Sequence, residues 1–163
     1  MEQYHALRFR KIKSVVKVQT YYHSIMKQSV GFIGGGRVTK ILLQAFCNKD
    51  VKFSTVVVAD PNNVATTKLK ELYPFIRVEN GPAAAMQDIV FISLHPPVIM
   101  ETLEILRKDV RSGATVISLA PKINMAKIAS KLDHVKNIAR LIPNATSYIN
   151  DGYNPVCFLQ EFD

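Results

Sequence analysis

The feature that most constrains the fold is a regular alternation of short apolar runs with longer amphipathic segments. From residue 28 onward, six apolar runs are separated by stretches whose apolar side chains recur at helical spacing. We therefore expect strands at 29–33, 55–59, 76–78, 89–94, 115–119 and 138–142. The run at 56–58 is entirely Val, as is typical of a strand buried on both faces. The pattern predicts a doubly wound parallel α/β sheet covered by helices on both faces.

The amphipathic segments predict the helices and, with the length, the domain organisation. Helices are expected at 37–48, 64–72, 98–107 and 125–132, with a short Ala-rich helix after Gly81. A chain of 163 residues suits one domain, which we place at 26–157, after a poorly ordered basic extension (1–25) and before a short tail (158–163). The longest apolar stretch, 89–100, is interrupted by His95 and two prolines, so we expect no membrane span.

The positive charge of the chain, +8 in total, is concentrated at its N-terminus. Residues 1–27 contain six Lys or Arg and one Glu, interleaved with aromatic side chains such as Tyr21 and Tyr22. Such a mixture is compatible with nucleic-acid or anionic-membrane contact, and its lack of acids with a mitochondrial presequence. The simplest interpretation is a frayed extension or upstream sequence read from an early start codon, because Met26 directly precedes the first apolar run. We therefore do not expect nucleic-acid binding.

The cysteines and histidines point to no metal or hydrolase chemistry. Cys47 and Cys157 lack the paired spacing of a zinc site or a disulfide framework, and the four histidines form no cluster. We expect both thiols to be buried, in a reducing compartment, which favours a cytoplasmic location. Ser93 and Ser118 lie at strand ends without a partnered histidine and acid, so a hydrolase triad is not predicted.

A glycine-rich turn between the first predicted strand and the first predicted helix is the sharpest motif. There Gly34 can make the tight turn, Gly36 lets the backbone approach a pyrophosphate, and the N–H groups of the helix start face the anion. Thr39 occupies the third position, where Gly or Ala is usual, so we expect the helix and strand to lie slightly further apart. The alternative is a purely structural turn. The glycine-rich turn follows the first predicted strand, and this position favours a dinucleotide site.

An acidic residue ends the second predicted strand. Asp60 lies 26 residues after Gly34, near the offset of the acid that binds the adenosine ribose, and a carboxylate there favours NAD. Four residues are close enough in sequence to bind a 2′-phosphate if Asp60 turns away: Arg37, Asn62, Asn63 and Lys68. Alternatively, Asp60 only initiates the Asp-Pro turn. The sequence thus leaves the choice between NAD and NADP open.

Together these motifs resemble those of pyrroline-5-carboxylate reductase. They are GFIGGG at 31–36, VADP at 58–61, DIVFISLHP at 88–96, VISLA at 116–120 and RLIPN at 140–144. The similarity covers about residues 29–157 and extends to related deazaflavin-dependent NADP oxidoreductases. It implies a Rossmann-type dinucleotide-binding fold and hydride transfer between NAD(P) and a small imine or similar C=N substrate.

The resemblance also implies where the cofactor contacts fall. The family's phosphate loop corresponds to 33–38 and its nicotinamide-ribose segment to 93–96, while Asn144 matches an asparagine whose amide can orient the nicotinamide or a substrate. Arg37 stands where the family has Asn, and His95 where Lys is typical. The implied cofactor-binding residues are Ile33, Gly34, Gly35, Gly36, Arg37, Val38, Asp60, Asn62, Leu94, His95, Pro96, Ala120 and Asn144.

No catalytic residue is assigned by the sequence. His95 follows a predicted strand within the expected cofactor crevice, and an imidazole with a pKa near neutrality is suited to general acid catalysis. The alternative, which we favour, is a loop histidine that lines the pocket.

Two functions remain at this point. The family adds a C-terminal helical domain that dimerises and builds the substrate pocket, and we expect that domain to be absent here. One hypothesis is an oxidoreductase domain whose site is completed by the missing domain or by a partner chain. The other is a stand-alone, non-catalytic NAD(P)-binding or regulatory module. In both cases we expect the chain by itself to bind dinucleotide, to turn over little substrate and to dimerise poorly.

Overall fold

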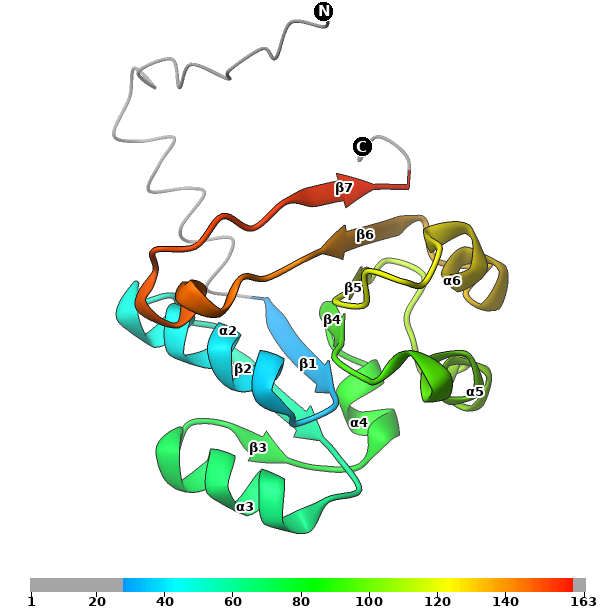
Figure 1. Ribbon diagram of the computed structural model, residues 1–163. Helices are drawn as coiled ribbons and strands as arrows, with labels where there is room; N and C mark the ends of the chain where they lie inside the picture. The colour runs from blue at the N-terminus through cyan, green and yellow to red at the C-terminus, as the bar shows by residue number, and fades with distance from the viewer. Residues whose placement is uncertain (1–27, 160–163) are drawn as a thin grey trace, which may run out of the picture.

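Seven strands pair into one sheet in the order β3-β2-β1-β4-β5-β6-β7 in the computed structural model, which describes residues 28–159 (Figure 1). The strands are β1 (Ser29–Ile33), β2 (Thr55–Ala59), β3 (Arg77–Val78), β4 (Ile89–Ile92), β5 (Thr115–Ser118), β6 (Asn137–Leu141) and β7 (Val156–Phe158). The helices are α2 (Arg37–Asn48), α3 (Asn63–Leu72), α4 (Gly81–Ala85), α5 (Pro96–Leu106), α6 (Met125–Lys131) and the 3₁₀ helix η1 (Ala145–Ile149).

The first six strands run parallel, as the alternating pattern predicts. Residues of β1 pair in register with β2 on one side and with β4 on the other, so Phe32 lies between Val58 and Phe91. The strand order therefore reverses between β1 and β4. In an open parallel sheet, ligands bind at the carboxyl ends of the strands at such a switch point.

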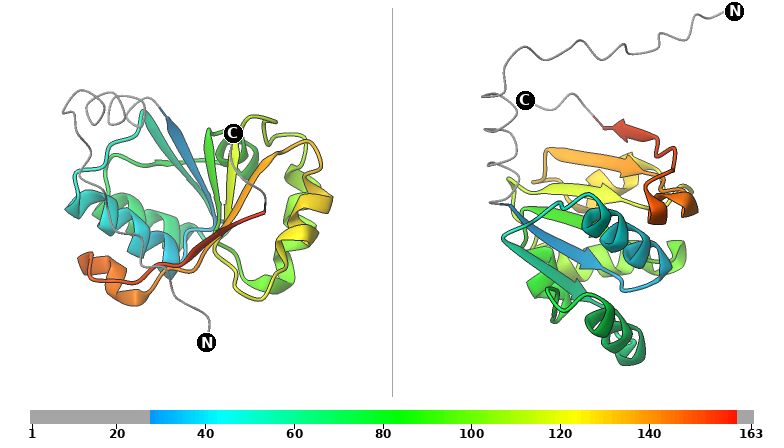
Figure 2. Two further views of the ribbon diagram at one scale, coloured as in Figure 1. Left: turned by 90° about the horizontal axis from the view of Figure 1, so that it is seen from above. Right: turned by 90° about the vertical axis from the view of Figure 1, so that its left-hand side faces the viewer.

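Helices cover both faces of the sheet (Figure 2). The strands alternate their side chains between the two buried layers that result. On one face, Val30, Phe32 and Val58 pack against α2 and α3; the rings of Phe32 and Phe91 stack there with centroids 4.8 Å apart. On the other face, Ile33 and Val57 pack against a layer made by α4, α5 and α6. Because both faces are covered, the central strands are mainly apolar, which explains the continuous runs in the sequence.

Three features differ from the sequence expectations or lie beyond them. β7 was not predicted: its three residues are exposed and follow Pro155, so the pairing of Cys157 with Arg140 in antiparallel β6 leaves little local signal. The prediction of two buried thiols is wrong, because Cys47 and Cys157 are both exposed. The predicted N-terminal extension, 1–25, lies outside the described residues. Within residues 28–159, no helix is long and apolar enough to cross a bilayer.

Candidate dinucleotide-binding site

The glycine loop after β1 is held between the ends of β2 and β4. Gly34 has a φ of +109°, a left-handed conformation that favours glycine, and its N–H donates to the Ala59 carbonyl at 2.7 Å. A side chain at this position is also excluded by space, since a Cβ would lie 2.3 Å from the Ser93 carbonyl oxygen. The fully buried Thr39 adds a second hydrogen bond, donated by its hydroxyl to the Gly34 carbonyl oxygen at 2.6 Å. The loop is thus positioned by three separate segments.

The start of α2 has the properties of an anion site. Its N-cap residue, Gly36, supplies no side-chain hydrogen bond, and no acidic residue lies in the first turn. The N–H groups there and the positive end of the helix dipole therefore remain available to a ligand. A Cβ built on Gly36 meets nothing within 4 Å, so the space in front of the loop is open. These residues fit a bound pyrophosphate.

Asp60 bonds to the loop and to its own turn. Its Oδ2 accepts a hydrogen bond from the Gly35 N–H at 2.7 Å, and its Oδ1 accepts one from the Asn62 N–H at 2.8 Å. The Asn62 side chain in turn caps α3 by accepting from the N–H groups of Val64 and Ala65. Asp60 is therefore part of the Asp-Pro turn, as one of the two interpretations predicted. Its contact with a ribose stays a prediction.

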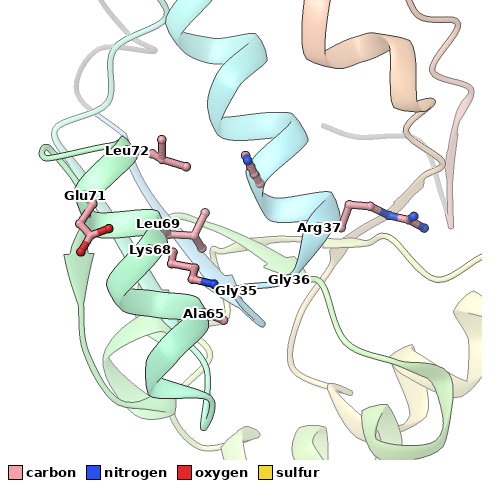
Figure 3. A pocket seen from close by; sticks show the side chains of 9 residues that line it. Gly35, Gly36, Arg37, Ala65, Lys68, Leu69, Glu71 and Leu72 are labelled. Atoms are coloured by element: carbon pink, nitrogen blue, oxygen red, sulfur yellow. The ribbon is translucent and has the colours of Figure 1, made fainter.

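Two pockets flank the glycine loop, each with a volume of about 430 Å³. The first, which we call the α2–α3 pocket (Figure 3), is lined by Gly35, Gly36, Arg37, Lys40, Ala65, Lys68, Leu69, Glu71 and Leu72. The second, the β4–α5 pocket, is lined by Gly36, Arg37, Val38, Ser93, Leu94, His95 and Leu119. Gly36 and Arg37 line both, so the two pockets meet at the start of α2. This arrangement suits a ligand with two arms joined by a central anionic group.

The structure brings six of the thirteen predicted cofactor residues to these two pockets. Gly35, Gly36 and Arg37 line the first, and Val38, Leu94 and His95 line the second with them. The other predicted residues lie outside both linings: Ile33, Gly34, Asp60, Asn62, Pro96, Ala120 and Asn144. Of these, Asn144 is the N-cap of η1, and its Oδ1 accepts a hydrogen bond from the Thr146 N–H at 3.0 Å.

Sequence reasoning missed Lys40, Ala65, Leu119 and the outer face of α3. Lys40 lies three residues after Arg37, one helical turn further along α2, and that spacing was the available signal. The α3 residues gave no such signal, because their place beside the glycine loop depends on the packing of two helices on the sheet. Lys68 was named from the sequence as one of four residues able to bind a 2′-phosphate, on its closeness to Asp60 in the chain.

Three cations line the α2–α3 pocket, Arg37, Lys40 and Lys68. The ion pairs found within residues 28–159 all involve side chains other than Arg37, Lys40 and Lys68. The pocket contains one carboxylate, Glu71. The α2–α3 pocket is therefore positively charged, which favours an anionic ligand.

The parallel sheet, its switch point and the glycine loop define a Rossmann-type dinucleotide-binding domain. The comparison with protein families is consistent with this class. Residues 29–122 match the model of the family described as "NADP oxidoreductase coenzyme F420-dependent". Because the match covers more than half of the chain, the protein belongs to this family.

Individual relatives are pyrroline-5-carboxylate reductases. The enzyme of Escherichia coli (strain K12) is 24% identical over 133 residues, which cover 80% of this chain and 49% of the relative. The crystal structure of the Plasmodium falciparum enzyme with NADP bound has a TM-score of 0.69 at 16% identity. The match covers 85% of this chain and 51% of the Plasmodium falciparum chain. The Coxiella burnetii enzyme has a TM-score of 0.73 at 20% identity, with coverages of 85% and 52%. The chain thus spans about half the length of the relatives it matches.

Proposed function

We propose that this chain is the dinucleotide-binding part of an NAD(P)H-dependent reductase that acts on a C=N substrate of the pyrroline-5-carboxylate type. The observation that carries the proposal is the meeting of two equal pockets at Gly36 and Arg37, directly beyond the switch point of the sheet. A dinucleotide has the matching shape, with two nucleoside arms joined by a pyrophosphate.

Each part of the site has a defined task in this proposal. The free N–H groups at the start of α2 and the Arg37 guanidinium bind the pyrophosphate. The α2–α3 pocket receives the adenosine side, and the β4–α5 pocket receives the nicotinamide side against Leu94 and Leu119. His95 lines the latter pocket and begins α5 as its N-cap residue. When bound, the reduced cofactor supplies the hydride, and the protein supplies its position.

The substrate class is supported by the relatives rather than by a pocket in this chain. The relatives are named as pyrroline-5-carboxylate reductases. About half of their length has no counterpart in this chain. We therefore propose that the substrate is enclosed on its other side by a further domain or partner chain. A cytoplasmic location is supported by the two exposed thiols, because free cysteines persist in reducing compartments.

Calorimetric titration of the full 163-residue chain with NADPH and with NADH tests the proposal. We expect at least one to bind with micromolar affinity, about −8 kcal/mol. In the same preparation, NADPH oxidation with pyrroline-5-carboxylate should be slow, because near-attack positioning needs both walls of the substrate site. If neither cofactor binds a folded sample, the proposed function is wrong. Fast turnover by the chain alone would instead show that this chain already builds the substrate site.

A further inference from the structure

We propose that Ser93 and Thr39 form a specificity-determining hydroxyl pair, in which Ser93 accepts a hydrogen bond from the ligand in the β4–α5 pocket and Thr39 holds Ser93 in the orientation that allows this. The inference rests on the proposed dinucleotide function and adds to it a side chain that selects for an O–H or N–H donor. The usual glycine-loop motif has Gly or Ala at the position of Thr39, so the motif itself contains no such hydroxyl.

The two hydroxyls form a short hydrogen-bonded chain that ends on the glycine loop. The fully buried Thr39 has its Oγ1 2.6 Å from the Gly34 carbonyl oxygen and 2.9 Å from Ser93 Oγ. A hydroxyl has one hydrogen, and a carbonyl oxygen can only accept. Thr39 therefore donates its hydrogen to Gly34, and the bond between the two hydroxyls has Ser93 as its donor. This arrangement fixes the direction of both bonds.

The direction of this chain decides what Ser93 offers to a ligand. Its hydroxyl hydrogen is directed to Thr39, so a lone pair of Oγ is what remains for another partner. Ser93 is partly exposed and lines the β4–α5 pocket, whereas Thr39 is fully buried and lies outside the lining. Ser93 is thus an acceptor toward the pocket, and Thr39 is a positioning residue that acts through it.

The main chain of Ser93 is held against the same loop as its side chain. Its N–H donates to the Ile33 carbonyl at 2.8 Å. Its carbonyl oxygen lies so close to Gly34 that a Cβ built there would be 2.3 Å away. Because backbone and hydroxyl are both fixed before a ligand arrives, the acceptor is preorganised and its use costs little conformational entropy.

The rest of the β4–α5 pocket makes this acceptor selective. None of the seven described residues that line it is acidic, and Arg37 can only donate hydrogen bonds. Val38, Leu94 and Leu119 supply apolar surface. A ligand donor that is buried against such surface without a partner is unfavourable, so the Ser93 oxygen favours a ligand with an O–H or N–H group at this place. A ligand oxygen without a hydrogen gains nothing from it.

Two parts of the nicotinamide side of a dinucleotide carry such donors, the ribose hydroxyls and the carboxamide. Calorimetric titration of the full wild-type chain and Ser93→Ala with ADP, ADP-ribose and NADH distinguishes them, since ADP has neither part and ADP-ribose has only the hydroxyls. Ser93→Ala should raise the Kd for NADH about threefold to tenfold, as for one neutral hydrogen bond, and leave the Kd for ADP within twofold. An equal loss for ADP-ribose identifies a ribose hydroxyl as the donor, and a loss confined to NADH identifies the carboxamide. The 2′-phosphorylated forms of the three ligands give the same comparison if NADPH binds more tightly.

Variants of Thr39 test its action through Ser93. Thr39→Val removes the hydroxyl at nearly constant size and frees the Ser93 hydrogen to turn toward the pocket. We expect it to raise the Kd for NADH about twofold to threefold in the wild type, and to change nothing further in the Ser93→Ala protein, because coupled residues are not additive. Thr39→Ser keeps a hydroxyl and should bind NADH as the wild type does.

Ser130→Ala is the matched control. Ser130 is exposed on α6, its hydroxyl donates to the Lys127 carbonyl at 2.8 Å, and it lines neither pocket. Its substitution should change no affinity. Unchanged NADH affinity in a folded Ser93→Ala protein would overturn the inference. Equal losses for ADP and NADH would also overturn it, because the hydroxyls would then only hold the loop. Failure of NADH and NADPH to bind the wild type would instead contradict the proposed function.

Discussion

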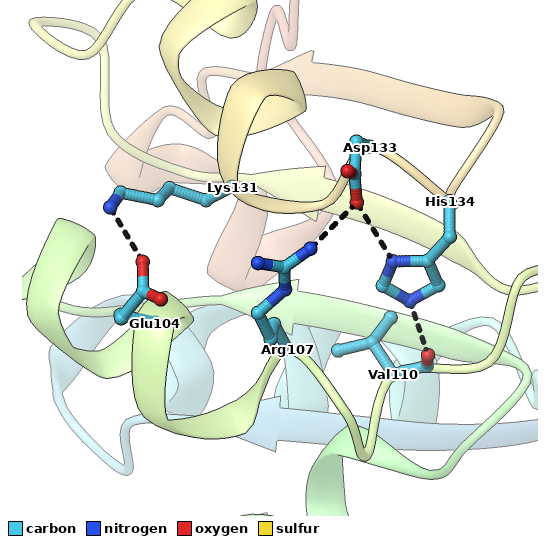
Figure 4. Close-up of polar contacts among 6 residues, drawn as sticks. All are labelled: Glu104, Arg107, Val110, Lys131, Asp133 and His134. Carbon is cyan, nitrogen blue, oxygen red and sulfur yellow. Dashed lines mark hydrogen bonds and ion pairs between the residues drawn. The ribbon is translucent and has the colours of Figure 1, made fainter.

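The α2–α3 flank and the α5–α6 flank carry similar numbers of basic side chains and use them in opposite ways. On the α5–α6 flank, Lys131 pairs with Glu104, and Arg107 pairs with Asp133 at 3.0 Å (Figure 4). His134 belongs to the same group of side chains, because its Nδ1 lies 3.6 Å from Asp133 Oδ1. Its Nε2 donates to the Val110 carbonyl at 2.8 Å. On the α2–α3 flank, Arg37, Lys40 and Lys68 border an open pocket and pair with no described residue.

The difference separates structural charges from ligand-binding charges. The paired cations join α5 to α6, which lie far apart in sequence but side by side on one face of the sheet. The unpaired cations are grouped at the carboxyl ends of the strands, where their mutual repulsion is unfavourable unless an anion binds. The cations that line the α2–α3 pocket are therefore available to a ligand, whereas Arg107 and Lys131 are already engaged in ion pairs.

The largest expected effect comes from closing the open space on the α2–α3 flank. Gly36→Val should raise the Kd for NADPH and NADH at least about tenfold, or about 1.4 kcal/mol, because a branched side chain blocks the approach of the pyrophosphate. The fold should persist, since a Cβ at Gly36 meets nothing within 4 Å and the residue has an extended conformation. Calorimetry measures the two Kd values, and circular dichroism shows whether the fold persists.

Gly113→Val is the matched control for that variant. Gly113 also has nothing within 4 Å of a built Cβ, but it lies in the turn before β5, away from both pockets. Its substitution should leave both affinities unchanged. Unaltered dinucleotide affinity in a folded Gly36→Val protein would remove the glycine loop from the site.

A smaller effect is expected from exchanging the arginines of the two flanks for alanine. Arg37→Ala should weaken NADH and NADPH equally, about threefold to tenfold, since it borders both pockets and contacts the shared pyrophosphate. The Tm of the Arg37→Ala protein should stay unchanged or rise. Arg107→Ala should leave both affinities unchanged and lower the Tm slightly, because an exposed ion pair to Asp133 is lost. Thermal melts with and without NADPH measure both quantities, and a reversed pattern would contradict the comparison.

The smallest expected effect is the contribution of the paired flank to the pH dependence of stability. The Lys131 ammonium lowers the pKa of Glu104, and the Arg107 guanidinium lowers the pKa of Asp133. Both carboxyl groups therefore bind protons more weakly in the folded chain than in the unfolded one. Their pairs stabilise the fold above the ordinary carboxyl pKa of about 4, and this stabilisation is lost as the pH falls through the lowered folded values.

Urea unfolding between about pH 7 and about pH 3 measures this dependence. The double variant Glu104→Gln with Asp133→Asn should lose stability less steeply with acid than the wild type. Removing the partners, in Arg107→Ala with Lys131→Ala, should flatten the profile in the same direction but to a smaller extent, because His134 still contacts Asp133 and lowers its pKa. If only one of the two double variants does so, the pairs are not the source of the effect.

Much of the fold is predictable because its signals are local. The valines at 56–58 and the helical spacing over 37–48 report how each segment buries its own apolar side chains, and the structure confirms both elements. β7 was missed because a three-residue exposed strand depends on a partner, β6, for its conformation. The burial of Cys47 and Cys157 was predicted wrongly for a related reason, since exposure at the margin of a layer is set by neighbouring elements.

The same division applies to the site. By itself the sequence determined six parallel strands and the loop at Gly34–Gly36, because side-chain periodicity and the conformational range of glycine act over a few residues. Only the tertiary structure decided that Asp60 bonds to Gly35, and that the Lys68 side chain points toward the loop and forms no ion pair within residues 28–159. Gly35 and Asp60 are 25 positions apart in the chain, and Lys68 is further still from the loop. Their geometry follows from the packing of α2 and α3 on one sheet, and no local pattern encodes it.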